Sequence, residues 1–388
     1  MKKNILFFDL FLIILVIGCF TFYKEQTDFS SVEKRYLEKI PRFSFGDYID
    51  GKYQETLEKA IADQFVFSED VKLNYDKLFD FSTAFDIKNK FCANHYINAG
   101  INRSYYGCKG NIVFAPISNC YPRDKDFLLG YNKLNNIVDT YYYIVDTSTI
   151  FDFEKNKYSC NLSAYYKSNL KGNYTISGFK IKSFKEYSKY FYKTDHHWNY
   201  KGSYKGYKEI MKMLGINDIR VPKSTNSFNN IKFYGSHDQQ IRKFDTYDDF
   251  YIYEYDLPEH DIFINGIKKP QYGFELNIDE ESIRSSRVVD VYAIVYGYDY
   301  GEILFDYKDE SKDNLLIISN SLDNPIDELI ASHFNKTFVW DSRFYEMDNF
   351  KLDNYIKENN ISKALIISDY FYVYDNIQLR SELFTDGF

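Results

Sequence analysis

The stretch Leu315-Leu316-Ile317-Ile318-Ser319-Asn320-Ser321 decides how this chain can fold. Its four consecutive apolar residues, with no polar alternation, are typical of a β-strand that is buried on both faces of a sheet. Polar residues follow directly, at what would be the carboxyl end of that strand. Functional groups of open α/β sheets gather at this end of the strands. The stretch therefore predicts an α/β fold and places serines where such a fold carries its chemistry.

Two further strands follow, with helices between them. Residues 327–334 and 352–358 look helical, and Thr337-Phe338-Val339-Trp340 and Ala364-Leu365-Ile366-Ile367 repeat the buried-strand pattern. The order strand–helix–strand–helix–strand predicts a parallel sheet with right-handed crossovers.

The pattern upstream is less regular. Residues 141–145 are predicted to form another buried strand, and residues 204–214 a helix that ends at Gly215. Residues 220–290 are rich in turns, aromatic residues and acids, and we expect a β-rich insertion or cap there. Residues 288–296 are predicted to form a strand.

Composition and charge narrow the class of protein. Hydrophobic residues make up 45% and charged residues 27% of the 388 residues, which is typical of a globular chain. The formal net charge of −8 argues against nucleic acid as a partner, because phosphate binding needs a basic surface. The 39 tyrosines and 35 phenylalanines could stack on sugar rings, although a compositional bias explains them more simply.

The apolar run from Ile5 to Tyr23 is long enough to cross a bilayer, since about 1.5 Å per residue gives about 30 Å. Lys2 and Lys3 precede it, so the positive-inside rule predicts a single-pass membrane anchor with the N-terminus inside. The stretch 16–19 resembles a lipobox, which leaves a lipoprotein modified at Cys19, or simple secretion, as alternatives. Each of the three places the rest of the chain outside the cytoplasm.

We expect three segments along the chain. Residues 1–24 form the membrane anchor or lipoprotein signal, residues 25–90 a polar helical juxtamembrane segment, and residues 91–388 the folded domain with the insertion at about 220–290.

The cysteines fit an oxidising compartment. Apart from Cys19 they are even in number and lie in one third of the chain, which favours disulfide bonds. No C-x-x-C spacing is present and a zinc site is not expected, while free thiols remain an alternative. The disulfide candidates are Cys92, Cys108, Cys120 and Cys160.

The run Thr194-Asp195-His196-His197-Trp198 carries the second chemical signal. Residues two apart point to the same face of an extended segment, so the Asp195 carboxylate can orient the His197 ring. The other ring nitrogen of His197 is then free to take a proton from a nucleophile. His196 points the other way, and we expect it to be structural.

A metal site is the alternative to an acid–base unit that these residue types allow. Asp195, His196, His237 and the pair His260-Asp261 offer suitable ligand atoms. Adjacent histidines on a strand diverge, however, and no pair has the H-x-x-x-H spacing of a helical metal site. We therefore expect neither a metal nor a cofactor.

The run 194–198, with Tyr192 before it and Gly202 after it, resembles the signature of the DHHW protein family. That family is related to the bacterial alginate O-acetylation proteins, whose fold is SGNH-hydrolase-like. The similarity continues in order along the chain, from residue 33 to about residue 370. The other stretches that carry it are Glu33-Lys34-Arg35 with Pro41, Asp63-Gln64-Phe65, Asn320-Ser321-Leu322-Asp323-Asn324 and Val339-Trp340-Asp341-Ser342-Arg343-Phe344-Tyr345.

The resemblance implies an SGNH-like three-layer catalytic domain with a triad. Ser321 would be the nucleophile, His197 the base and Asp195 the residue that orients the base. The backbone N–H of Leu322 would be an oxyanion donor. Further candidates for oxyanion or substrate binding are Asn324, Arg343, Trp198 and Tyr192.

The chain departs from the family pattern beside the nucleophile. Asn320 stands where the family has an aspartate, and Leu322 where it has an aromatic residue. Two of the binding candidates also have structural alternatives, because Trp198 can be a packing residue and Arg343 can hold a loop through a salt bridge.

The resemblance and the N-terminal run together predict an extracytoplasmic O-acetyltransferase that acts on a cell-surface or exported polysaccharide. Its acetyl donor would be a membrane-bound O-acyltransferase, because acetyl-CoA is cytoplasmic. A carbohydrate acetyl esterase would use the same triad with water as the acceptor. A catalytically inactive glycan-binding surface protein is the third alternative, from a different class.

Overall fold

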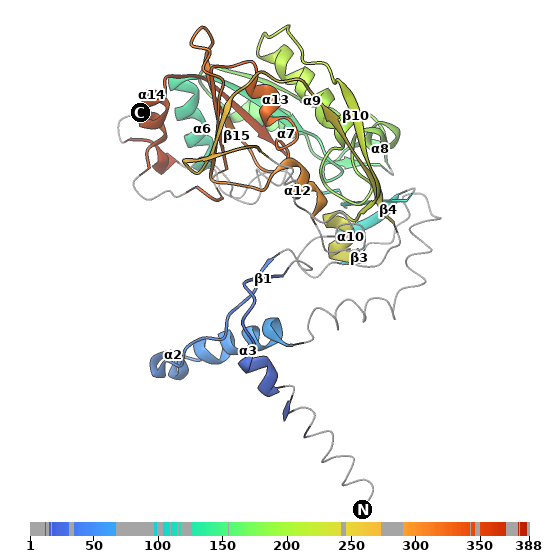
Figure 1. Cartoon of the computed structure of the whole chain (residues 1–388), viewed down its shortest axis with the longest axis vertical. Helices are drawn as coiled ribbons and strands as arrows, with labels where there is room; N and C mark the ends of the chain where they lie inside the picture. Colours follow the sequence, from blue (N-terminus) through green and yellow to red (C-terminus); the bar gives the residue numbers. More distant parts are fainter. Residues whose placement is uncertain are drawn as a thin grey trace, which may run out of the picture. The chain divides into compact units, whose positions relative to one another are not determined.

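The computed structural model describes residues 12, 15–16, 18–30, 35–66, 97–98, 104–108, 110–114, 116–117, 126–153, 155–241, 246–272, 290–341, 343–345, 350–369, 379 and 381–385. The chain forms two compact units (Figure 1). One consists of residues 1–85 with 239–245, and the other of residues 86–238 with 246–388.

The first unit contains helices α2 (Phe45–Ile49) and α3 (Lys52–Gln64) and the antiparallel pair β1 (Phe29–Ser30) and β2 (Arg35–Tyr36). Gln64, at the end of α3, is fully buried. Its amide nitrogen donates to Thr27 O at 2.9 Å and to Glu38 O at 3.1 Å, so it ties the preceding segment to the helix.

Most of the predicted anchor, residues 1–24, lies outside the described residues, although residues 18–23 are helical. Within the part of the chain that the structure describes, no helix is both long and apolar enough to span a membrane. Residues 67–90 of the predicted juxtamembrane segment also lie outside the described residues.

An eight-stranded sheet forms the centre of the second unit. In order across the sheet its strands are β13 (Ile267–Lys269), β12 (Asp261–Ile264), β14 (Glu302–Asp306), β16 (Lys336–Trp340), β15 (Asn314–Ile318), β17 (Ile361–Ser368), β6 (Asp139–Val145) and β9 (Tyr174–Phe179). The five strands from β16 to β9 are parallel, and β14, β12 and β13 extend the sheet by antiparallel pairing. The predicted parallel sheet is therefore confirmed.

Helices cover both faces of the sheet, which gives a three-layer α/β fold. Neighbouring residues of β15 face opposite ways: Ile317 lies in one core cluster, and Leu316 and Ile318 lie in another. The first cluster includes residues of α8 (Phe184–Tyr190), α9 (Tyr200–Met213) and α13 (Asp327–Ala331). The second includes residues of α6 (Asp126–Ile137), α7 (Leu162–Asn169) and α14 (Leu352–Glu358) (Figure 1).

The segment expected as an insertion supplies two hairpin-like pairs. β10 (Ser224–Phe233) pairs with β11 (Asp248–Glu254) as a separate sheet, and β12 pairs with β13 at the edge of the main sheet. The remaining elements are β3 (Ile97–Asn98), β4 (Ser104–Cys108), β5 (Asn111–Phe114), β7 (Phe151–Asp152), β8 (Lys157–Tyr158), α10 (Ser236–Ile241), α12 (Val291–Tyr296) and the 3₁₀ helix η1 (Ser381–Leu383).

The strand predicted over residues 288–296 is wrong, because residues 291–296 form helix α12. Its β-branched and aromatic residues have high strand propensity. Its ends are nevertheless those of a helix: the Asp290 side chain accepts a hydrogen bond from Ala293 N at 3.1 Å, and Gly297 follows with a φ of 88°. Capping and burial of one helical face outweigh the strand propensity of these residues.

The topology concentrates loops at one edge of the sheet. The connection from β15 to β16 runs through α13, on one face of the sheet. The connection from β6 to β9 runs through α7, on the other face. Crevices form at the carboxyl ends of strands where connections diverge in this way. The carboxyl end of β15, which carries Ser321, lies beside this point.

Candidate active site

A tight turn after β15 presents Ser321. The Ser319 hydroxyl donates to Ile367 O at 3.0 Å, which fixes the end of β15 to the neighbouring strand β17. Asp323 N donates to Asn320 O at 3.2 Å, and Leu322 N donates to Asn320 Oδ1 at 3.2 Å. With the Leu322 side chain buried beneath it, the turn leaves Ser321 at the edge of the sheet.

Ser321, His197 and Asp195 form a continuous hydrogen-bonded chain. His197 Nε2 lies 2.8 Å from Ser321 Oγ, and His197 Nδ1 lies 2.5 Å from Asp195 Oδ1. His197 N also donates to Asp195 Oδ1 at 2.9 Å, and Ser236 N donates to Asp195 Oδ2 at 2.6 Å. Both oxygens of the carboxylate are thus bonded, which fixes the orientation of the imidazole.

The β10–β11 segment holds the Asp-His run in place. The Asp248 carboxylate accepts from Lys193 N at 2.8 Å, from Thr194 N at 3.0 Å and from the Thr194 hydroxyl at 2.8 Å. Gly235 N donates to Thr194 Oγ1 at 3.0 Å. A Cβ on Gly235 would lie 2.7 Å from Asp195 Oδ2, so only glycine allows this close approach.

Burial and neighbouring charge set the ionisation of the two aspartates that hold this run. Burial alone would raise the pKa of Asp195, but His197 and His196 beside it hold that pKa well below its usual range. Asp195 therefore stays a carboxylate. Burial raises the pKa of Asp248 to about 6, although three N–H and O–H donors oppose the shift.

Two more buried carboxyl groups, Asp323 and Asp327, lie just beyond Ser321. Burial and the adjacent Asp327 raise the pKa of Asp323 well above its usual range. Burial raises the pKa of Asp327 to about 7. Two carboxyl groups this close cannot both ionise at neutral pH, so we infer that the pair shares a proton.

Tyr292 of α12 contacts both His197 and the loop that carries Ser321. Its ring stacks on His197 with a centroid separation of 3.8 Å and an interplanar angle of 13°. Its hydroxyl donates to Ser321 O at 2.8 Å. Sequence reasoning missed Tyr292, because the Asp290 cap and Gly297 are the only helix signals around a segment whose residues favour a strand.

The structure gives three of the predicted binding residues other partners. Asn324 Nδ2 donates to Gly297 O at 3.0 Å, which joins the nucleophile loop to the end of α12. Arg343 forms ion pairs with Asp341 at 2.5 Å and Asp299 at 2.8 Å, so its observed role is to hold a loop. The Leu322 N–H, the expected oxyanion donor, is bonded to Asn320 Oδ1.

Trp198 and Tyr192 are core residues. Trp198 is 0% exposed and lies against Gly206, where a Cβ would come within 2.6 Å of the indole. Tyr192 is 2% exposed and stacks on Phe250 at 5.6 Å. Neither ring is accessible to a substrate, and the reason is that both anchor the ends of the Asp-His run in the core.

Three histidines outside the Asp195–His197–Ser321 chain have described polar partners. His196 Nδ1 lies 2.7 Å from Ser236 Oγ, and His237 Nδ1 lies 2.8 Å from Ile112 O. His260 pairs with Glu328 at 3.0 Å. Among the described residues, the one group with metal-ligand geometry is Asp195 with His196 and His197, and two of these three already bond to each other within the triad.

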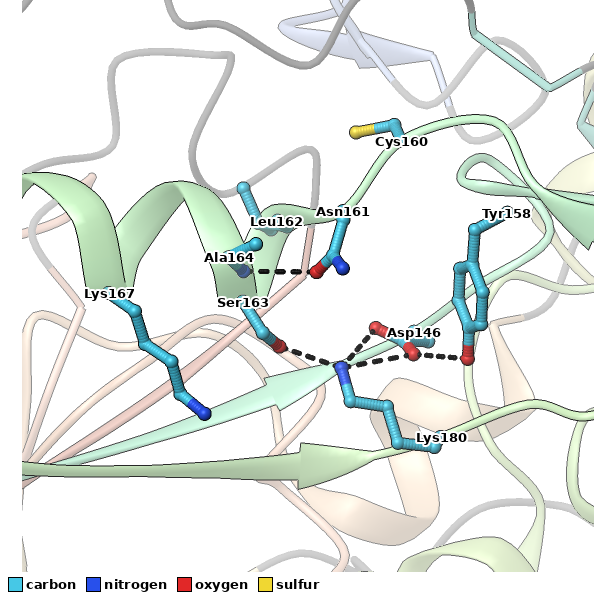
Figure 2. Close-up of a pocket in the computed structure, with 9 residues that line it drawn as sticks. All are labelled: Asp146, Tyr158, Cys160, Asn161, Leu162, Ser163, Ala164, Lys167 and Lys180. Carbon is cyan, nitrogen blue, oxygen red and sulfur yellow. Dashed lines mark hydrogen bonds and ion pairs between the residues drawn. The ribbon is translucent and has the colours of Figure 1, made fainter.

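A pocket of about 340 Å³ lies at the carboxyl ends of β6 and β9 (Figure 2). Lys180 Nζ lies between Asp146 and Ser163, at 3.3 Å and 2.7 Å, and the Tyr158 hydroxyl donates to Asp146 at 2.7 Å. These four side chains bond to one another and so join the ends of the two strands.

Cys160, beside this pocket, takes part in a disulfide bond. Cys92 and Cys120 lie outside the described residues, as does the side chain of Cys108. Cys19 is a free, exposed thiol.

The fold is similar to that of a solved DHHW family protein and of PatB1. A DHHW family protein from Eubacterium siraeum is 16% identical, with a TM-score of 0.54, over 73% of this chain and 95% of that chain. PatB1 of Bacillus cereus, solved with a sulfonyl adduct, is 17% identical, with a TM-score of 0.57, over 72% of this chain and 98% of that chain. AlgX of Pseudomonas aeruginosa is 9% identical over 73% of this chain and 66% of that chain, with a TM-score of 0.32.

No protein-family model and no curated protein matches the chain. The resemblance to DHHW proteins found in the sequence is confirmed by the structural neighbours, and at these identities it establishes the fold.

Gly235→Ala should lower activity by about tenfold or more, because the new methyl group forces the Asp195 carboxylate out of line with His197. Turnover of an acetyl ester and the thermal midpoint, measured together, check this. Gly46→Ala is the matched control, since a Cβ there meets nothing within 4 Å. Full activity in a folded Gly235→Ala protein would contradict the described packing.

Asp327→Asn should flatten the dependence of stability on pH. A carboxyl group whose pKa is raised on folding contributes stability that is lost as pH rises through its folded value, here about 7. The loss begins near the unfolded pKa of about 4, so the gain of the variant over the wild type should be larger at about pH 8 than at about pH 5, by about 1 kcal/mol or more.

Urea unfolding at the two pH values measures this difference. Asp261→Asn is the control, because Lys268 and Lys308 hold the pKa of Asp261 at about 2 and it stays ionised throughout the window. If Asp327→Asn keeps the pH dependence of the wild type, Asp327 does not hold the shared proton.

Proposed function

We propose that this protein is an extracytoplasmic O-acetyltransferase that moves an acetyl group onto a hydroxyl of a cell-surface or exported polysaccharide. The observation that carries the proposal is the bonded chain from Asp195 through His197 to Ser321, with links of 2.5 Å and 2.8 Å. A carboxylate, an imidazole and a serine in this order support acyl transfer through a covalent intermediate.

In the first half-reaction, His197 Nε2 takes the Ser321 hydroxyl proton while Oγ attacks the carbonyl carbon of an acetyl ester. The tetrahedral intermediate then collapses, and the leaving oxygen takes that proton from His197. Ser321 is left acetylated. Asp195 keeps the Nδ1 proton directed toward itself, so Nε2 is the nitrogen that accepts, and the carboxylate stabilises the imidazolium.

In the second half-reaction, a sugar hydroxyl gives its proton to His197 Nε2 as its oxygen attacks the acetyl group on Ser321. Collapse breaks the bond between the acetyl carbon and Ser321 Oγ, and the serine takes the proton back. Water in place of the sugar would give an esterase, so what distinguishes the two is the acceptor and not the triad.

The negative oxygen of each tetrahedral intermediate needs hydrogen-bond donors. The Leu322 N–H is on the residue after the nucleophile, but it now donates to Asn320 Oδ1. Rotation of the Asn320 side chain would free it. An asparagine at this position, unlike the aspartate of the family pattern, also has an NH₂ group that can donate.

Two observations support a location outside the cytoplasm. The apolar run from Ile5 to Tyr23 has the length of a membrane anchor. Cys160 is disulfide-bonded, and structural disulfides persist in oxidising compartments. A donor of acetyl groups in the membrane, such as a membrane-bound O-acyltransferase, would then supply the first half-reaction, because acetyl-CoA stays in the cytoplasm.

Ser321→Ala and His197→Ala should each lower acetyl transfer by about a thousandfold or more, because each removes an essential member of the unit. Transfer is measured with a chromogenic acetyl ester as donor and an oligosaccharide as acceptor. Ser319→Ala is the matched control in the same turn, because its hydroxyl bonds to Ile367 O and not to His197. Near-normal transfer by the Ser321 and His197 variants would contradict the catalytic proposal.

The same assay separates the alternative functions. Acetylated oligosaccharide, detected by mass spectrometry, supports the transferase. Acetate release with no acetylated sugar identifies an esterase. Neither product, together with unchanged polysaccharide acetylation in cells that carry Ser321→Ala, identifies an inactive surface protein.

A further inference from the structure

We infer that Tyr292 is a positioning residue that holds His197 and Ser321 at reacting distance. The inference rests on the proposed function in one respect, which is that Ser321 must be the nucleophile. It concerns how this serine is activated and is independent of whether the acceptor is a sugar or water.

The two contacts of Tyr292 reach both partners of the reacting pair. Its ring lies flat on the His197 imidazole, 3.8 Å between centroids and 13° between planes, and its hydroxyl donates to Ser321 O at 2.8 Å. The side chain is 2% exposed. Tyr292 thus bonds the backbone of Ser321 and covers one face of the His197 ring. The hydrogen bond between His197 Nε2 and Ser321 Oγ is 2.8 Å long.

Helix α12 holds Tyr292 firmly enough for this role. The Asp290 side chain caps the start of the helix, and Asn324 Nδ2 donates to Gly297 O at its end, at 3.0 Å. The helix is therefore joined to the nucleophile loop twice, once through the Tyr292 hydroxyl and once through Asn324. Val291 and Val295 are buried beside Tyr292, so the helix cannot turn without opening a core cluster.

Each contact has its own chemical effect. The hydroxyl fixes the Ser321 backbone, and burial, with Tyr296 and the Asp195 carboxylate nearby, raises the pKa of Tyr292 so far that it stays a donor. The ring limits rotation of the imidazole and keeps water from one of its faces. It also offers its π-face to the imidazolium that forms when His197 takes the serine proton, and such a face stabilises a cation.

Tyr296, one turn further along α12, provides a matched control. Its ring contacts Tyr292 at 5.0 Å, and its hydroxyl donates to Tyr251 O at 3.4 Å. Tyr296 thus lies in the same helix and the same cluster as Tyr292. Its described contacts are with other aromatic residues and with β11, and not with His197 or Ser321.

The test measures how fast phenylmethylsulfonyl fluoride modifies Ser321 in the full chain, followed by intact mass spectrometry and peptide mapping over a range of pH. Tyr292→Phe keeps the stack and loses the hydroxyl, so the rate should fall about tenfold, the effect of losing one hydrogen bond. Tyr292→Leu loses both contacts, and the rate should fall about a hundredfold, as expected when reacting groups are misplaced.

The pH profile distinguishes positioning from general loosening of the fold. Without the aromatic face the imidazolium is less stable, so the midpoint of the Tyr292→Leu profile should move to lower pH, while Tyr292→Phe and Tyr296→Phe keep the midpoint of the wild type. Thermal midpoints of all variants show whether they are folded. Loss of fold would lower the rate without moving the midpoint of the remaining folded protein.

The inference is overturned if Tyr292→Phe and Tyr292→Leu react at the wild-type rate while Ser321→Ala does not react, and the proposed nucleophile then stands. It is also overturned if Tyr296→Phe loses as much reactivity as Tyr292→Phe. If the wild-type protein is not modified at Ser321, the proposed function fails together with it.

Discussion

The site depends on one hydrogen bond, 2.8 Å long, between His197 Nε2 and Ser321 Oγ, which joins residues 124 positions apart in the sequence. A bond over this separation forms only if independent parts of the fold fix both ends. β15, β17 and the turn at Asn320 fix the serine. The Asp195 carboxylate, itself held through the β10–β11 segment, fixes the histidine. α12 then links the two ends through Tyr292.

Burying carboxylates near the site costs free energy of folding. The four buried aspartates offset this cost in different ways. Asp195 is held ionised by two histidines and two backbone N–H groups. Asp248 uses its buried oxygens to bind the backbone of the Asp-His run. Asp323 and Asp327 lie against each other, and sharing a proton reduces their repulsion beside Ser321. The buried carboxyl groups of Asp195 and Asp248 thus bind the ring and the backbone of the Asp-His run.

Much of the fold was predictable from the sequence, because strands buried on both faces leave an uninterrupted apolar run. The runs at Leu315, Thr337 and Ala364 became β15, β16 and β17, and residues 141–145 became the end of β6. Helix α12 was missed because six residues are too few for helical periodicity to outweigh strand propensity. The decisive signal there was the pair of caps and not the residues between them.

Part of the site was also predictable from a local pattern in the sequence. The spacing of Asp195 and His197 predicts that one side chain orients the other, since local geometry fixes residues two apart. The contacts of Tyr192 and Asn324 were not predictable, because they depend on burial and on partners distant in the sequence. Packing of Trp198 and a salt bridge of Arg343 were alternatives that the sequence left open, and the fold decides between them. Trp198 fits against Gly206, and Arg343 pairs with Asp299, and neither contact leaves a mark in the local pattern.

In the proposed reaction, Ser321 carries the acetyl group from the donor to the acceptor. The most direct measurement is peptide mass spectrometry of protein mixed with an acetyl ester and quenched with acid before the acceptor is added. We expect one acetyl group on Ser321, which disappears when oligosaccharide is supplied. Acetate release or sugar acetylation with no acetyl group on Ser321 at any time would contradict it.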